Sequence, residues 1–100
     1  MNYFNAGVWL QPHYEKAHKG GEDAASMSSN VLCVADGVGG WISQGIDPAI
    51  YSKNLCKYID AIVQKSDDYI EDPKQILIEA VAENRHIGSC TCVIAALDKH

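Results

Sequence analysis

The stretch that decides the fold is Val31-Leu32-Cys33-Val34-Ala35-Asp36-Gly37-Val38-Gly39-Gly40-Trp41. Its first five residues are apolar and partly β-branched, which is typical of a buried strand. This strand carries one carboxylate, Asp36, directly into a turn that has glycine at positions 37, 39 and 40. Glycine lets the backbone approach a bound group closely because it has no Cβ. We therefore expect Asp36 to be held rigidly at a strand end, beside backbone that a ligand can reach.

A second acidic segment, Gly20-Gly21-Glu22-Asp23-Ala24, lies upstream and is also adjacent to glycine. Residues 22–28 are expected to form a strand that joins residues 31–36 through a turn at Ser29-Asn30. Carboxylate oxygens presented from neighbouring strand ends suit hard divalent cations. The two acidic segments together indicate a candidate metal-binding corner.

Periodicity and turn residues predict an α+β fold. The expected order is strands at 3–10, 22–28 and 31–36, helices from Asp47 to about 65 and from Asp72 to Gly88, and a strand at 89–97. Each helix begins with an Asp-Pro pair, in which Asp is the N-cap and Pro takes the first helical position. Strands that precede the helices favour a layered architecture over βαβ units. The last strand is apolar enough to be buried on both faces, so the sheet needs further cover from a larger domain or a partner chain.

Composition favours one globular domain over residues 1–100, with 47% hydrophobic and 21% charged residues. The formal net charge is −5 and no basic block occurs, which argues against a nucleic-acid partner. No apolar run approaches the roughly 18 residues of a membrane-spanning helix, and no secretory signal is visible at the N-terminus. We expect an intracellular protein with no membrane partner.

The four cysteines, at positions 33, 56, 90 and 92, lack the spacing of zinc sites. Cys33 lies within the apolar strand, and Cys90 and Cys92 share one face of another strand. We expect buried, free thiols, which is consistent with a reducing compartment.

The glycine turn after Asp36 has other interpretations. A dinucleotide-binding turn requires a third glycine and an immediate helix, but position 42 is Ile and the next helix begins at Asp47. The P-loop and the nucleophile elbow of serine hydrolases lack their defining residues here. A purely structural turn remains open, in which Asp36 caps backbone amides. Trp41 is then a packing anchor over the turn, or else it borders a substrate cleft.

Gly20-Gly21-Glu22-Asp23-Ala24, followed by Val34-Ala35-Asp36-Gly37-Val38-Gly39-Gly40-Trp41, resembles the opening motifs of the metal-dependent serine/threonine phosphatases, the PPM or protein phosphatase 2C family. The segments Gly45-Ile46-Asp47-Pro48 and Gly88-Ser89-Cys90-Thr91-Cys92 resemble the branch that includes mitochondrial and plant forms related to bacterial sporulation phosphatases. The resemblance runs from about Tyr3 to Asp98. It implies the N-terminal portion of an α-β-β-α sandwich, incomplete in this chain, and a mitochondrial, plastid or cytoplasmic location.

The resemblance also implies a site for two Mn²⁺ or Mg²⁺ ions. Asp36 matches the aspartate that bridges both ions, and Gly37 matches the glycine whose carbonyl is a ligand, which would explain the missing side chain there. Glu22 matches a metal ligand, and Asp23 matches the neighbouring acid at the metals that orients metal-bound water. Asp36 and Asp23 are thus the expected catalytic residues for hydrolysis of phosphoserine or phosphothreonine in a phosphoprotein substrate by a metal-activated water.

The chain departs from the family pattern in three places. Many members carry Arg five residues before the position of Asp23, where this chain has His18 followed by Lys19 as candidate ligands of substrate phosphate. Val38 stands where many members have His. The aspartates that complete the family's metal site come from a downstream region. We therefore expect the parent protein to be a phosphatase and this chain to be inactive alone; the alternatives are a non-catalytic, phosphatase-derived interaction module completed by a partner chain, and an unrelated binding domain.

Overall fold

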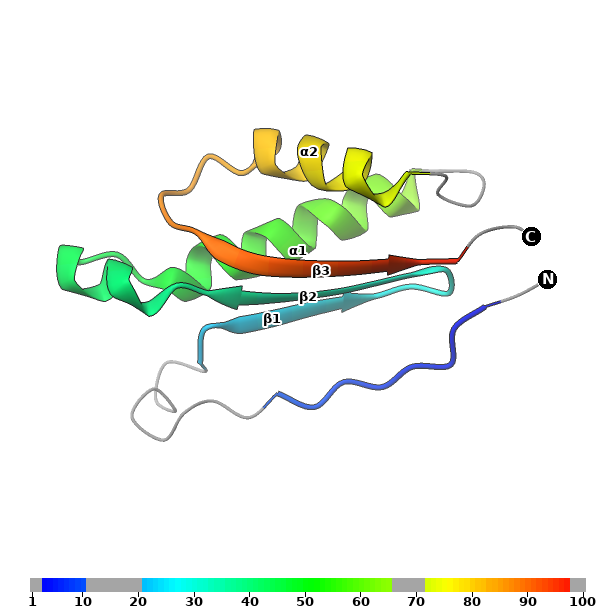
Figure 1. Ribbon diagram of the computed structural model, residues 1–100, viewed down its shortest axis with the longest axis horizontal. Coiled ribbons are helices and arrows are strands. Elements are labelled where there is room, and N and C mark those ends of the chain that lie inside the picture. The colour runs from blue at the N-terminus through cyan, green and yellow to red at the C-terminus, as the bar shows by residue number, and fades with distance from the viewer. Residues whose placement is uncertain (1–2, 11–20, 66–71, 98–100) are drawn as a thin grey trace.

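A three-stranded antiparallel sheet with helices on one face forms the structure, a computed structural model that describes residues 3–10, 21–65 and 72–97 (Figure 1). The sheet has the order β1-β2-β3, with β1 at Asp23–Met27, β2 at Val31–Gly37 and β3 at Cys90–Ala96. Between β2 and β3 lie a 3-10 helix, η2 (Gly39–Gln44), and the helices α1 (Pro48–Gln64) and α2 (Pro73–Glu83). The predicted α+β order, with antiparallel strands before the two helices and a strand after them, is confirmed.

Local chemistry explains where these elements begin. The β1–β2 turn forms where predicted, and the Ser28 hydroxyl accepts a hydrogen bond from the Val31 N–H at 2.9 Å. Asp47 caps α1 by accepting from the Ala49 N–H at 3.0 Å, and Asp72 caps α2 by accepting from the Lys74 N–H at 3.1 Å. The Asp-Pro pairs therefore start both helices, as the sequence predicts.

The second helix ends earlier than predicted. Instead of continuing toward Gly88, α2 ends at Glu83, with Asn84 as an extended C-cap. The buried Asn84 side chain donates a hydrogen bond from Nδ2 to the Tyr51 carbonyl of α1 at 3.1 Å. This contact with α1 holds Asn84 outside the helical conformation, so tertiary structure rather than glycine ends the helix.

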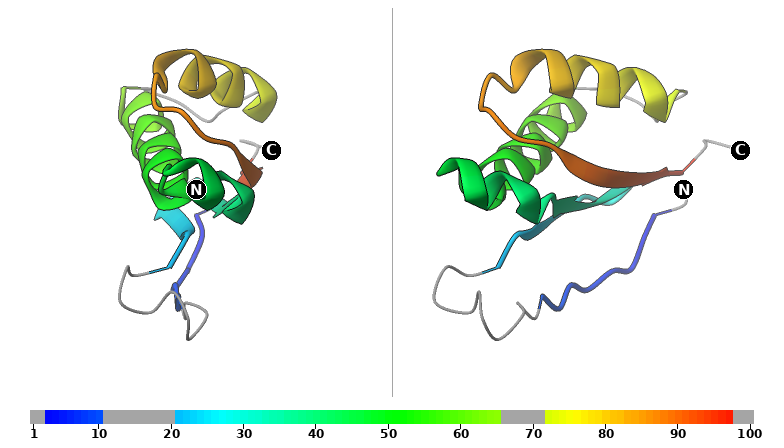
Figure 2. Two further views of the ribbon diagram at one scale, coloured as in Figure 1. Left: turned by 90° about the vertical axis from the view of Figure 1, so that its left-hand side faces the viewer. Right: turned by 60° about the vertical axis from the view of Figure 1, so that its left-hand side comes forward.

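The core lies between the sheet and α1, and α2 packs alongside α1 (Figure 2). On β2, burial alternates along the strand, and Val31, Cys33 and Ala35 face the helices. Leu55 and Ile59 of α1 are the largest apolar side chains that are completely buried beneath the sheet. From α2, only Ile76 and Ala80 are fully buried.

Two expectations about strands are wrong. Residues 3–10 run beside β1, on the side away from α2 (Figures 1 and 2), and the Phe4 N–H donates to the Ser29 carbonyl at 2.7 Å, but they form no strand. A strand requires a continuous hydrogen-bonded partner, which this segment lacks among the described residues. Strand β3 is also not buried on both faces: Val93 is 70% exposed, because the helices cover only one face of the sheet.

Within the described ranges, neither α1 nor α2 combines the length and apolar character needed to cross a membrane.

Candidate metal-binding corner

Asp23 and Asp36 lie directly opposite each other across the β1–β2 pair. The next pair along the ladder is hydrogen-bonded, because the Gly37 N–H donates to the Glu22 carbonyl at 3.1 Å. Asp23 and Asp36 therefore form a non-hydrogen-bonded pair, the kind in which opposite side chains are closest. Their Cβ atoms are expected to be about 4.5–5.5 Å apart. The structure thus brings together two acids that are separated by twelve residues in the sequence.

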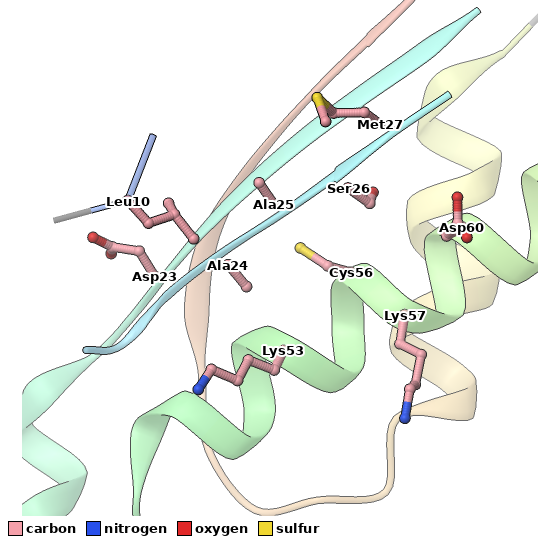
Figure 3. A pocket seen from close by; sticks show the side chains of 10 residues that line it. All are labelled: Leu10, Asp23, Ala24, Ala25, Ser26, Met27, Lys53, Cys56, Lys57 and Asp60. Carbon is pink, nitrogen blue, oxygen red and sulfur yellow. The ribbon is translucent and has the colours of Figure 1, made fainter. Parts of the chain in front are cut away.

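Strand alternation sets the direction of both carboxylates. Asp36 is exposed, whereas its neighbours Ala35 and Gly37 are buried toward the helices. Asp23 likewise lies on the opposite side of β1 from Ala24, as Figure 3 shows. The two acids consequently share the face of the sheet that the helices leave uncovered, where an ion and a substrate can reach them.

The backbone beneath this corner is tied together at the Glu22 carbonyl. This oxygen accepts from the Gly37 N–H and also from Ser52 Oγ of α1, the latter at 2.6 Å. Ser52 is completely buried. One carbonyl therefore joins the start of β1, the end of β2 and the first turns of α1.

Gly37 is required by packing in this arrangement. A Cβ at this position would lie 2.8 Å from the Pro48 carbonyl oxygen and 3.0 Å from the Glu22 carbonyl oxygen. Both are backbone atoms that cannot rotate away. The close approach of α1 therefore accounts for glycine at position 37. This packing reason is independent of the metal contact through the Gly37 carbonyl that the family resemblance implies.

The loop that follows Asp36 is fixed to the start of β3 through Ser89. The Val38 N–H donates to the Ser89 carbonyl at 3.0 Å, and Trp41 Nε1 donates to Ser89 Oγ at 2.8 Å. Trp41 is half-buried over the turn, which matches its interpretation as a packing anchor. These bonds leave little freedom for the backbone immediately after Asp36.

Thr91 is a neighbour of Asp36 that the sequence did not reveal. It lies directly opposite Asp36 on β3, so Asp36 is flanked by Asp23 on one side and Thr91 on the other. The pairing joins residues that are 55 positions apart, and no local pattern specifies such a register. Ser52 and Ser89 were missed for the same reason, although a polar residue within the apolar stripe of a helix could have drawn attention to Ser52.

The other expected site residues are Glu22, His18 and Lys19. Glu22 is half-buried just before β1, and its Oε1 atom is shielded from solvent. His18 and Lys19 lie outside the described residues. Within 3–10, 21–65 and 72–97, no group of three or more His, Cys, Asp or Glu side chains is arranged to hold a metal ion.

The donor chemistry of the Asp23–Asp36 pair nevertheless fits part of a cation site. Like charges directly opposite each other on a strand pair repel, by roughly 0.2–1 kcal/mol. A divalent cation between them would offset this repulsion, and Mn²⁺ and Mg²⁺ both take carboxylate oxygens as ligands. Two carboxylates do not complete such a coordination sphere, so further ligands are required.

Comparison with known proteins identifies close similarity over most of the chain. It is 38% identical over 96 residues to "Probable protein phosphatase 2C 1" of Oryza sativa subsp. japonica, which covers 93% of the chain and 29% of that protein. It is 36% identical over 98 residues to "Probable protein phosphatase 2C 26" of Arabidopsis thaliana, which covers 95% of the chain and 33% of that protein. No family model matches the chain.

A solved structure is similar to this chain in both fold and sequence. The X-ray structure of the photosystem II phosphatase PBCP superposes with a TM-score of 0.81 at 37% identity, over 91% of this chain and 37% of that chain. This chain spans about a third of the length of each of these three proteins.

Proposed function

We propose that this chain, which corresponds in sequence and fold to part of a PPM-type (protein phosphatase 2C) domain, contributes one side of the two-metal site of a protein serine/threonine phosphatase. The observation that carries the proposal is the Asp23–Asp36 pair on the uncovered face of the sheet. The relatives support it because they are named as protein phosphatases of this family.

When bound, Mn²⁺ or Mg²⁺ would supply the chemistry of the proposed function, by lowering the pKa of water so that it can attack phosphoserine or phosphothreonine. Asp36, Glu22 and the backbone carbonyl of Gly37 would hold the ions, as the resemblance to the family implies. Asp23 would orient the water by accepting a hydrogen bond from it. The Ser52 and Ser89 hydrogen bonds keep these groups in place before substrate arrives, which reduces the reorganisation needed during the reaction.

The remaining metal ligands would come from outside the described residues, as the resemblance to the family implies. We accordingly propose that residues 1–100 form a partial phosphatase domain that does not turn over substrate alone. The substrate would be a phosphoprotein, with His18 and Lys19 as the candidate contacts to its phosphate. The proposed location is inside the cell, in a mitochondrion, a plastid or the cytoplasm.

A second candidate function is a non-catalytic interaction module whose uncovered sheet face is completed by a partner chain. The observation that favours it is the exposure of apolar side chains on that face, including Val34 and Val93. A module of this kind does not require Asp36 as a metal ligand. Substitution of Asp36 therefore distinguishes the two candidate functions, because only the phosphatase should lose activity and metal binding.

The experiment grafts residues 1–100 onto the downstream part of the similar rice protein, in place of its aligned segment, and measures Mn²⁺-dependent hydrolysis of a phosphothreonine peptide. The unsubstituted graft should be active, and Asp36→Asn should lower its rate by more than about 100-fold, since loss of a direct metal ligand exceeds the effect of outer-shell changes. Glu79→Gln, on the exposed surface of α2, is the matched control and should leave the rate unchanged.

The same pair of variants in the isolated 100-residue chain tests binding without catalysis. Mn²⁺ binding measured by electron paramagnetic resonance should weaken on Asp36→Asn and remain unchanged on Glu79→Gln. Equal activity and equal Mn²⁺ binding of the Asp36→Asn and unsubstituted proteins would reject the metal assignment and favour the interaction module.

A further inference from the structure

Three thiols from three different elements meet beneath the sheet. Cys33 of β2 lies with its Sγ 3.5 Å from Cys92 Sγ of β3 and 3.8 Å from Cys56 Sγ of α1. All three are free cysteines, and Cys33 and Cys56 are only 1% and 3% exposed. We call Cys33, Cys56 and Cys92 the thiol cluster. Cys33 is its centre, because both short sulfur–sulfur contacts involve it.

The closer contact, between Cys33 and Cys92, is poorly placed for a disulfide. Cys33 pairs with Ile94 in the ladder and Cys92 pairs with Ala35, so the two cysteines are diagonal neighbours. Diagonal positions on adjacent antiparallel strands are about 7–8 Å apart, whereas a disulfide usually requires Cα atoms about 4.4–6.8 Å apart. The hydrogen-bonded sheet resists the backbone shift that this bond would need.

The contact between Cys33 and Cys56 has no such restriction. Cys56 is on α1, which packs against the sheet without a fixed hydrogen-bonded register. A disulfide has an S–S length of about 2.05 Å, so the two sulfurs need to approach by only about 1.8 Å from their present 3.8 Å. Rotation of the Cys56 side chain and a small shift of the helix can supply this movement.

Cys56 is the member of the cluster that borders a surface pocket, from which a small reagent would approach it. It lines a surface pocket of about 430 Å³ between β1 and α1. Figure 3 shows the Cys56 sulfur directed toward β1, in the view between Ala24 and Ser26. Lys53 and Lys57 lie on either side of Cys56 along α1 and also line the pocket. Neither Cys33 nor Cys92 lines this pocket.

We infer that Cys56 and Cys33 form a site of reversible oxidation, in which a hydroperoxide that enters the pocket converts the two thiols into an intramolecular disulfide. The Cys56 thiol gives up its proton, and the thiolate attacks one peroxide oxygen, so that the O–O bond breaks and a Cys56 sulfenic acid forms. For hydrogen peroxide the leaving group is hydroxide, which takes up the proton that Cys56 released and becomes water. Cys33 sulfur then attacks Cys56 Sγ, the S–O bond breaks, and the Cys33 proton leaves with the hydroxyl as a second water. Two thiols lose two electrons, and the peroxide gains them.

The acidities of the two thiols agree with this division of roles. The hydrogen bond with Cys33 lowers the pKa of Cys56, which favours the nucleophilic thiolate at the pocket. The same hydrogen bond, together with burial, raises the pKa of Cys33 to about 12. Cys33 therefore stays protonated until the sulfenic acid forms next to it.

The test uses hydrogen peroxide on the full 100-residue chain, reduced beforehand and freed of metals with a chelator. The sequence suits tryptic mapping, because trypsin places Cys33 in residues 20–53, Cys56 in 54–57, and Cys90 with Cys92 in 86–99. We expect two of the four thiols to disappear, with a mass loss of two hydrogen atoms. The unreduced digest should join 20–53 to 54–57, and dithiothreitol should separate them again.

Two variants separate this proposal from non-specific oxidation. Cys90→Ser is the matched control, since no sulfur contact involves Cys90 among the described residues, and it should keep the same cross-link. Cys33→Ser should abolish the cross-link and leave a Cys56 sulfenic acid that dimedone traps. In concentrated guanidinium chloride, oxidation should no longer favour the Cys33–Cys56 disulfide over other pairings, because unfolding separates β2 from α1.

Several outcomes would overturn the inference. These are survival of all four thiols under peroxide, a cross-link from 20–53 to 86–99 in place of 54–57, or cross-links only between molecules. The map of the unsubstituted chain decides among them even if a variant fails to fold. None of these readouts depends on metal binding or phosphatase activity, so the result is independent of the proposed function.

Discussion

At the residue scale, the neighbouring residues Asp36 and Gly37 have separate physical roles. Asp36 projects from the uncovered face, where its charge is available to a ligand. Gly37 faces the opposite way, into the first turn of α1, and leaves room for the Pro48 carbonyl. The adjacent pair therefore serves chemistry on one face of the sheet and packing on the other.

This division predicts the effect of Gly37→Ala. The added Cβ would lie 2.8 Å from the Pro48 oxygen, so either the start of α1 or the end of β2 must shift, at a cost of about 1–3 kcal/mol in the free energy of unfolding. Urea denaturation followed by circular dichroism measures this change. Gly40→Ala is the matched control, because a Cβ there meets nothing within 4 Å. Equal stability of the two variants would contradict the packing role.

At the element scale, the corner depends on how α1 meets the ends of β1 and β2. Ser52 lies on the buried side of α1, and its hydroxyl reaches the backbone of Glu22 rather than only its own helix. The Asp47 cap fixes where α1 begins, and so determines which residue of the helix reaches the Glu22 carbonyl. Helix capping and site geometry are therefore linked through Ser52.

We expect Ser52→Ala to destabilise the chain by about 1 kcal/mol, the typical net contribution of one hydrogen bond. The Glu22 carbonyl keeps its bond from the Gly37 N–H, so the loss should not approach that of a fully unsatisfied carbonyl. Ser43→Ala is the control: Ser43 is exposed and its hydroxyl bonds only to the nearby Gly40 carbonyl in the described structure. Thermal unfolding of both variants checks the difference, and a larger effect at Ser43 would contradict the argument.

At the scale of the whole molecule, the sheet has one covered face and one uncovered face. The helices bury Val31, Cys33 and Ala35, while Val34 and Val93 remain 54% and 70% exposed on the other face. Strand β3 also forms one edge of the sheet. Exposed apolar surface next to an unpaired strand edge favours association between chains.

The isolated chain is therefore expected to bind a hydrophobic dye and to self-associate at high concentration. Val93→Thr should reduce dye fluorescence and shift sedimentation toward the monomer, because it removes apolar surface from the uncovered face while keeping a β-branched residue in β3. Val81→Thr, on the exposed side of α2, is the matched control and should have a smaller effect. A monodisperse monomer that does not bind the dye would show that the uncovered face of the sheet does not promote association between chains.

The segments that sequence reasoning placed correctly are those governed by neighbouring residues. The Asp-Pro helix starts, the Ser29-Asn30 turn and the strand leading into Asp36 all depend on local chemistry. The prediction was wrong where a partner decides the outcome. Residues 3–10 have a strand-like composition but no hydrogen-bonded ladder, and α2 ends at Glu83 because the side chain of the next residue, Asn84, bonds to α1.

The sequence by itself determined that acidic residues lie next to glycines at two places along the chain. It also identified the family pattern to which these two segments correspond. Only the tertiary structure decided that Asp23 lies opposite Asp36, that Ser52 secures the Glu22 carbonyl, and that Cys33 meets Cys56. Turns and caps are specified within a few residues, because their hydrogen bonds close over short distances along the chain. Strand register and helix packing join residues that are far apart in sequence, so they are fixed only when the whole core packs.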